Sequence, residues 1–156
     1  TKSPNVFLSP CEENVNSAPQ HHFVGNAALR SLNDWIVKGI APPSAPRIMV
    51  NGAGTDVGRD VYGNAMGGVR SSYMDVPVAV FSGDNVSVKN ESDICFLFGK
   101  TEWLDRDTVN SLYPDKAAYV SSVSDSANKL VESGYLLQED AAFIVDAAKQ
   151  SRVISE

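Results

Sequence analysis

The length, composition and charge of this chain set the first limits on what it can be. It has 156 residues, enough for one domain with a buried core, and 43% of them are hydrophobic. The formal net charge of −6 at pH 7, with no run of basic residues, argues against a nucleic-acid partner because phosphate binding needs clustered Lys and Arg. No stretch approaches the roughly 20 apolar residues of a transmembrane helix, so we expect no membrane span.

The first part of the chain is expected to be a loop over residues 1–19, followed by a helix over residues 20–38. The loop segment has no apolar period and carries three prolines: Pro4, Pro10 and Pro19. In the helical segment, apolar residues recur at three- and four-residue spacing, which predicts one buried face: Phe23, Val24, Ala27, Ala28, Leu32, Trp35 and Ile36. Gly39 and the prolines after it end the helix. We expect Trp35 to be a strong packing anchor in its last turn.

Residues 39–104 are expected to form an irregular region that carries strands. A short strand can form at 47–50, and another is predicted at 75–81, where a proline places it at an edge or at the strand's start. The continuous apolar run 94–98 predicts a buried strand that could pair with the previous one. The glycine-rich segment 62–68 lacks the spacing of a phosphate-binding loop, so we interpret it as a mobile or tightly turned loop.

Residues 105–156 are expected to be a helical tail. Asp105 and Asp115 can each cap a helix, the first ending before a proline and the second ending at a glycine. A last helix is expected from about 139 to 152, with four residues toward the core: Ala142, Phe143, Ile144 and Val145. The predicted fold class is α/β, with one helix, an irregular strand-bearing middle and a helical tail.

Two cysteines and two glycosylation motifs bear on the compartment of the protein. Cys11 and Cys95 are the only cysteines, and the tripeptides that begin at Asn85 and Asn90 match the N-glycosylation pattern. Two such motifs in one polar loop and an even cysteine count favour an oxidising, secretory route. A disulfide between the cysteines would close a long loop and contribute roughly 4 kcal/mol. Two free buried thiols are the alternative.

The sequence does not contain a complete set of serine-hydrolase residues. The motif G-x-S-x-G, which presents the nucleophile on a sharp turn, is absent, and the nearest string, 68–72, lacks the second glycine. His21 and His22 are the only imidazoles and therefore the only candidate bases. They stand at the start of the predicted helix, where the helix dipole disfavours an imidazolium. We therefore interpret both as surface or packing histidines.

Other polar residues give no firmer candidate for catalysis. Nothing in the sequence selects an acid and a base among the five aspartates of the loop-rich middle: Asp56, Asp60, Asp75, Asp84 and Asp93. We expect these to be solvated turn residues, and we expect Arg70 and Asp75 to form a structural ion pair. The cysteines and histidines lack metal-ligand spacing, so no metal site and no cofactor are predicted.

A set of motifs runs in order along residues 11–148. It includes the segments 15–24, 67–70, 75–77, 95–99 and 134–137, with Trp35 in the first helix. Together these motifs resemble the C-terminal region of a family called the alpha/beta hydrolase domain proteins. Each motif alone is weak, but the ordered set is fairly specific. Ala18 departs from the pattern, which has glycine at that position.

The resemblance implies a larger ester hydrolase whose nucleophile, acid and base histidine all precede the segment that Cys11 opens. It also implies that Cys11 pairs with Cys95, that the Trp35 helix covers the sheet, and that the segment 67–77 helps to line the site entrance. Residues 1–156 would then be the C-terminal part of an α/β-hydrolase domain, inactive alone. Its expected partners are the N-terminal portion of the same precursor, separated by proteolysis, and a small ester substrate.

Two rival functions remain open at this point. One is a non-catalytic binding or structural glycoprotein built on a hydrolase scaffold. The other is a self-contained hydrolase that uses His21 or His22 with Ser71 or Thr1, since an N-terminal Thr can use its own amine as base. We interpret the start at Thr1 rather than Met as a processing site or an arbitrary start. A homo-oligomer is compatible with each of these functions.

Overall fold

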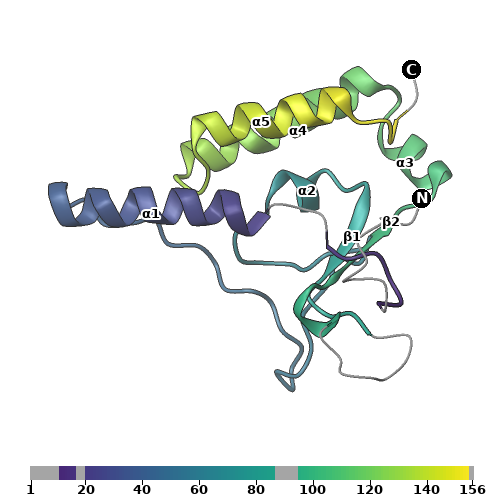
Figure 1. The fold of residues 1–156 in the computed structure, drawn as a ribbon, viewed down its shortest axis with the longest axis horizontal. Helices are drawn as coiled ribbons and strands as arrows, with labels where there is room; N and C mark the ends of the chain where they lie inside the picture. The colour runs from purple at the N-terminus through teal and green to yellow at the C-terminus, as the bar shows by residue number, and fades with distance from the viewer. Residues whose placement is uncertain (1–10, 17–19, 87–94, 155–156) are drawn as a thin grey trace.

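The computed structural model describes residues 11–16, 20–86 and 95–154. The element order is α1 (Gln20–Lys38), α2 (Ser72–Asp75), β1 (Ala79–Ser82), the 3₁₀ helix η1 (Cys95–Leu97), β2 (Lys100–Trp103), α3 (Arg106–Leu112), α4 (Lys116–Glu132) and α5 (Gln138–Gln150). In Figure 1, α4 and α5 lie side by side above the small sheet, and α1 extends away from it. The architecture is therefore mixed α/β, as the sequence predicted.

The strands β1 and β2 form an antiparallel two-stranded sheet, with Ala79 opposite Trp103 and Ser82 opposite Lys100. The prediction of a buried strand at 94–98 is wrong, because the chain there forms η1 and leaves Leu97 exposed. Gly99 has a φ of 58°, a left-handed value that ends the apolar run and turns the chain before β2 begins. The strand that pairs with β1 is therefore the more polar segment that follows this glycine.

The strand predicted at 75–81 is shorter than expected and follows a single helical turn. Ser72–Asp75 forms α2, and β1 begins only at Ala79, after Pro77. The segment 47–50 forms isolated bridges instead of a strand, with Ile48 opposite Gly67. Residues 39–71, between α1 and α2, thus form a long irregular loop, which we call the excursion. It lies below the other elements in Figure 1.

The core lies where α4 and α5 cover α2 and β1. Asp115 caps α4 by accepting a hydrogen bond from Ala118 N (2.8 Å), and Asp105 caps α3 by accepting one from Thr108 N (2.8 Å), as predicted. In α5 the buried residues are Ala141, Ile144 and Ala148, whereas Ala142 and Phe143, which we expected to face the core, are exposed. Consecutive residues of a helix point in different directions, so they cannot share one buried face.

Helix α1 spans the predicted residues but packs differently from the prediction. It buries only Phe23 and Ala27, whereas Trp35 and Ile36 are 54% and 76% exposed. Its first half is held against α5 by a hydrogen bond from Asn26 Nδ2 to Asp140 Oδ2 (3.0 Å). Figure 1 shows the second half projecting beyond the other elements. The expectation that Trp35 is a packing anchor is therefore wrong for this structure, whereas the covering of the sheet by α1 stays a prediction.

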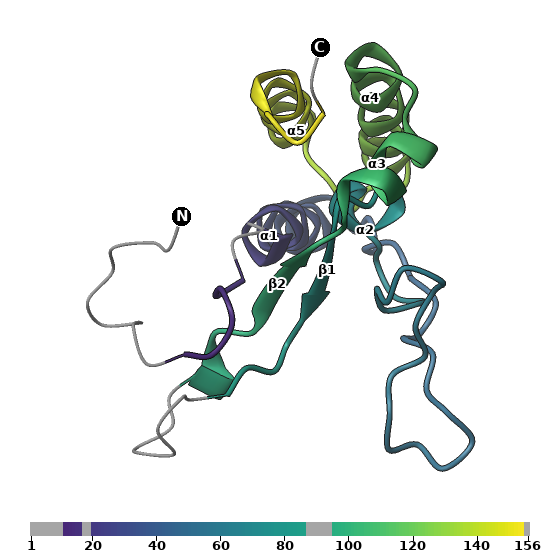
Figure 2. The same cartoon turned by 90° about the vertical axis from the view of Figure 1, so that its right-hand side faces the viewer.

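A disulfide joins Cys11 to Cys95, with an S–S distance of 2.07 Å, and confirms the predicted pairing. It holds the segment 11–16 against the sheet, where Thr101 N donates to Asn14 O (2.9 Å). Glu12 N donates to Val86 O (2.8 Å) on the other side of the bridge. Figure 2 shows this segment running past the lower end of the two strands. The disulfide therefore ties the first described residues to the centre of the chain.

Candidate functional site

The candidate residues His21 and Ser71 both line a cavity of about 430 Å³ near the start of α1. Val24 of α1 also lines it, and the other walls come from β1 and from the excursion before α2, including Ile48, Val69 and Phe81. Ser71 precedes α2 and is buried, and its hydroxyl donates to Gln20 Oε1 (2.7 Å). The structure thus brings the start of α1 and the start of α2 together.

This cavity does not contain a nucleophile–base pair. An amide oxygen such as Gln20 Oε1 cannot take a proton from Ser71 at neutral pH, so the serine is not activated. His21 and His22 are exposed, and neither imidazole hydrogen-bonds to a residue that the structure describes; His22 packs edge-on against Phe23. Thr1 lies outside the described residues. The described residues therefore do not assemble serine-hydrolase chemistry.

The aspartates of the middle region occupy structural positions. Asp60 and Asp75 both pair with Arg70, at 2.8 and 2.6 Å, which confirms the predicted Arg70–Asp75 ion pair. Asp56 accepts from Asn51 Nδ2 (2.7 Å) in an exposed turn, and Asp84 accepts from Ser82. Asp93 lies outside the described residues. Among the residues described, no group of three or more His, Cys, Asp and Glu is placed to hold a metal ion.

The guanidinium of Arg70 holds the glycine-rich segment against α2. Besides its two carboxylate partners, it donates to Ala65 O and to Met74 O, the latter at 2.9 Å. Asp60 also accepts hydrogen bonds from Tyr62 N and Asn64 N, both at 3.0 Å. Four hydrogen bonds of the planar guanidinium thus join Asp60 and the glycine-rich segment to α2. The segment is a braced turn and not an open loop.

Asn64 is a structural residue that the sequence did not identify. Its side chain is fully buried, where Nδ2 donates to Ala79 O and Oδ1 accepts from Phe81 N, both at 3.0 Å. The amide therefore pairs with the free edge of β1 in place of a neighbouring strand. An asparagine in a glycine-rich segment usually indicates an exposed turn, so no sequence signal separated this one from its neighbours.

The Arg70 network changes the ionisation of Asp60. Burial opposes the charged form, but the hydrogen bonds from Arg70, Asn64 and Tyr62 outweigh it, and the pKa of Asp60 is lowered from 3.8. A carboxyl whose pKa is lower in the folded state stabilises the fold above its unfolded pKa. That contribution is lost as the pH falls through the folded pKa. Asp60 therefore adds to the loss of stability in acid.

We expect the substitution Asp60→Asn to flatten the dependence of stability on pH below about pH 4. The free energy of unfolding of both proteins is measured by urea denaturation at several pH values from about 5 down to about 2. Other carboxyls contribute equally to both proteins, so the difference in slope reports Asp60. Parallel pH profiles would show that Asp60 keeps its ordinary pKa in the fold.

The structure describes the asparagine of only one of the two glycosylation motifs. Asn85 is 4% exposed, and its Nδ2 donates to Gly99 O (2.8 Å) and Glu13 O (3.2 Å). A glycan would replace one of these donor hydrogens and would have to leave a buried site. The expectation of a glycan at Asn85 therefore does not fit the folded chain. Asn90 lies outside the described residues and stays a prediction.

Glycopeptide mapping of the natural protein is expected to find Asn85 unmodified and any glycan on Asn90. The reason is that both hydrogens of the Asn85 amide are used inside the fold. The variant Asn90→Gln should then lose all N-linked carbohydrate from residues 1–156, whereas Asn85→Gln should lose none. A glycan recovered on Asn85 would contradict this prediction.

Comparisons with known proteins identify one family. A family model described as "Alpha/beta hydrolase domain" matches residues 2–146, which is most of the chain. No curated protein and no protein of solved structure matches the chain significantly. None of the helices in the described part of the chain is both long and apolar enough to cross a membrane.

Proposed function

This chain belongs to the alpha/beta hydrolase domain family, and from that premise we propose that it is the C-terminal portion of a secreted ester hydrolase. It completes the hydrolase fold and shapes the substrate pocket, while the nucleophile lies outside residues 1–156. The N-terminal portion of the same precursor is its partner. Alone, the chain is inactive because it has no nucleophile elbow.

The observation that carries this proposal is the exposed apolar surface of α1. Leu29, Leu32 and Ile36 follow the spacing of one helix face and are all exposed, as is Trp35. Exposed apolar residues continue in the excursion that follows: Ile40, Ile48, Met49, Val50 and Val57. Exposed apolar residues in this number are typical of an interface, because leaving them in water is unfavourable. A further part of the hydrolase domain would bury them.

The sheet also supports a larger domain. The structure describes two paired strands, and a two-stranded sheet alone is marginally stable in water. In an α/β-hydrolase the nucleophile is presented at the top of the sheet, on a turn from a strand to a helix. Additional strands would therefore supply both the missing elbow and a continuous layer beneath the helices.

The disulfide supports the secretory part of the proposal. Disulfides such as the Cys11–Cys95 bond form and persist in oxidising compartments, whereas the cytosol keeps thiols reduced. A glycan on Asn90 would be consistent with the same route. The chain would then be a subunit or a proteolytic product of a secreted glycoprotein.

Labelling of the natural protein with a fluorophosphonate probe tests where the nucleophile lies. Peptide mapping is expected to find the label on a serine outside residues 1–156, within a G-x-S-x-G sequence. Label on Ser71 or Thr1 would contradict the proposal and favour the self-contained hydrolase. A folded protein that takes no label would favour the non-catalytic binding or structural glycoprotein.

A further inference from the structure

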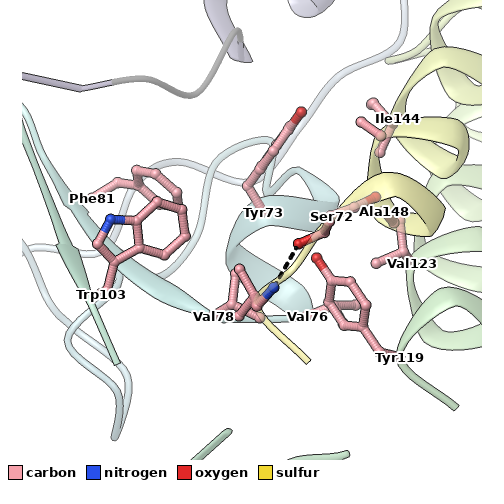
Figure 3. Close-up of a pocket in the computed structure, with 13 residues that line it drawn as sticks. Ser72, Tyr73, Val76, Val78, Phe81, Trp103, Tyr119, Val123, Ile144 and Ala148 are labelled. Carbon is pink, nitrogen blue, oxygen red and sulfur yellow. Dashed lines mark hydrogen bonds between the residues drawn. The ribbon is translucent and has the colours of Figure 1, made fainter. Parts of the chain in front are cut away.

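A second cavity, of about 150 Å³, lies between the helical pair α4–α5 and the elements α2, β1 and β2 (Figure 3). Most of its wall is apolar and includes Val76, Val78, Phe81, Val123 and Ile144. None of the described residues that line it is charged. The cavity is thus suited to a neutral, largely apolar molecule, because a buried charge would have no partner there.

The size and accessibility of the cavity limit what can enter. A cavity of about 150 Å³ holds a molecule of the size of benzene. Trp103 and Ala147 line the cavity and are also exposed, so it opens to solvent on their side. The side chains of Trp103 and Phe81 both line the cavity and are drawn on the same side of it in Figure 3.

The few polar side chains that line the cavity carry hydroxyl groups, and Tyr119 is one of them. The hydroxyl of Tyr119 makes no hydrogen bond to a described residue, and in Figure 3 it points toward Ser72. Ser72 Oγ is buried and also has no hydrogen-bond partner in the described structure. Burial raises the pKa of Tyr119, so its hydroxyl stays protonated and can donate. Tyr113 packs against the Tyr119 ring with 5.1 Å between centroids and fixes its direction.

We propose that this cavity binds a small neutral molecule consisting of one six-carbon ring or chain and a single hydroxyl or carbonyl group that pairs with Tyr119. The apolar part occupies the space between Phe81, Trp103 and Ile144, and the polar group forms a hydrogen bond with the Tyr119 hydroxyl. The proposal depends on this cavity alone and is independent of where the hydrolase nucleophile lies.

Binding of matched probes to the natural, full-length protein tests the charge preference. Benzyl alcohol and benzoate have similar sizes, but only benzoate is charged at neutral pH. Isothermal titration calorimetry is expected to show at least tenfold tighter binding of benzyl alcohol, since no cation lines the cavity. Equal affinities for the two probes, or no binding of benzyl alcohol at millimolar concentration, would overturn the proposal.

Replacing each of two alanines with leucine tests where benzyl alcohol binds. Ala147 lines the cavity and is exposed, so Ala147→Leu should fit the fold and obstruct the opening, weakening benzyl alcohol binding at least tenfold. Ala117 is exposed on α4 and does not line the cavity, so Ala117→Leu should leave the affinity unchanged. Circular dichroism is used to check that both variants fold. Identical affinities of the two variants would place the probe elsewhere and overturn the proposal.

A pair of tyrosine substitutions tests the polar end. Tyr119→Phe should weaken benzyl alcohol binding about fivefold, which corresponds to one neutral hydrogen bond, and should leave toluene binding unchanged. Tyr135 does not line the cavity, so Tyr135→Phe should not change either affinity. If Tyr119→Phe binds benzyl alcohol as tightly as the unaltered protein, the assigned hydrogen bond is wrong.

Discussion

Replacing both cysteines with alanine is expected to lower the free energy of unfolding by about 4 kcal/mol. The bond joins residues 84 positions apart, so its removal frees a long loop and raises the entropy of the unfolded chain. Alanine suits the fully buried Cys95 better than serine, because serine would bury an unpaired hydroxyl. Urea denaturation of the double variant Cys11→Ala, Cys95→Ala measures the change.

The natural protein after reduction is the matched control, because it keeps both cysteine side chains but not the bond. If the loop entropy dominates, the reduced protein and the double variant should be destabilised to a similar extent. The difference between them measures the volume lost with the two sulfur atoms. Reduced protein that unfolds at the same urea concentration as oxidised protein would show that the bond does not stabilise this fold.

The helical tail could be predicted from the sequence because its signals are local. Asp105 and Asp115 precede their helices at the position where a side-chain oxygen can accept a backbone N–H, and both do so. Gly134, with a φ of 78°, ends the turn after α4 as its position suggested. The even cysteine count favoured the pairing of Cys11 with Cys95, and the family resemblance supported it.

The burial of α1 could not be predicted in the same way. Its apolar spacing specifies a face that needs covering, but periodicity does not say which part of the protein covers it. The apolar face of α1 is buried only near Phe23 and Ala27, and Trp35 is exposed to solvent. The same spacing is compatible with a core face and with an interface, so only the arrangement of the other elements distinguishes them.

The polar contacts of the middle region also required the structure. Arg70–Asp75 was accessible from sequence because the two residues lie close along the chain. The contacts of Asp60 with Arg70 and of Asn64 with β1 depend on how the excursion folds back, and no periodic pattern records this. The burial of Asn85 likewise depends on the path of the segment 11–16, because the Asn85 amide donates a hydrogen bond to Glu13 O in that segment.

The substitution Arg70→Ala is expected to lower the free energy of unfolding by about 3 kcal/mol. It removes hydrogen bonds to two carboxylates and two carbonyls, and it leaves Asp60, whose side chain is 19% exposed, without its cation. Arg70→Lys keeps the charge but cannot reach all four acceptors, so about half of the loss is expected. Urea denaturation of the three proteins gives both values.

An exposed ion pair supplies the control for this series. Lys149 and Asp146 are paired at 2.8 Å, but their side chains are 58% and 62% exposed, so Lys149→Ala should cost less than about 0.5 kcal/mol. Combining Arg70→Ala with Asp60→Asn should cost less than the sum of the single changes, because the double variant leaves no buried carboxylate unpaired. Strict additivity, or a loss for Arg70→Ala no larger than that for Lys149→Ala, would mean that the glycine-rich segment is held by other contacts. The braced turn would then not position α2 beside the two cavities.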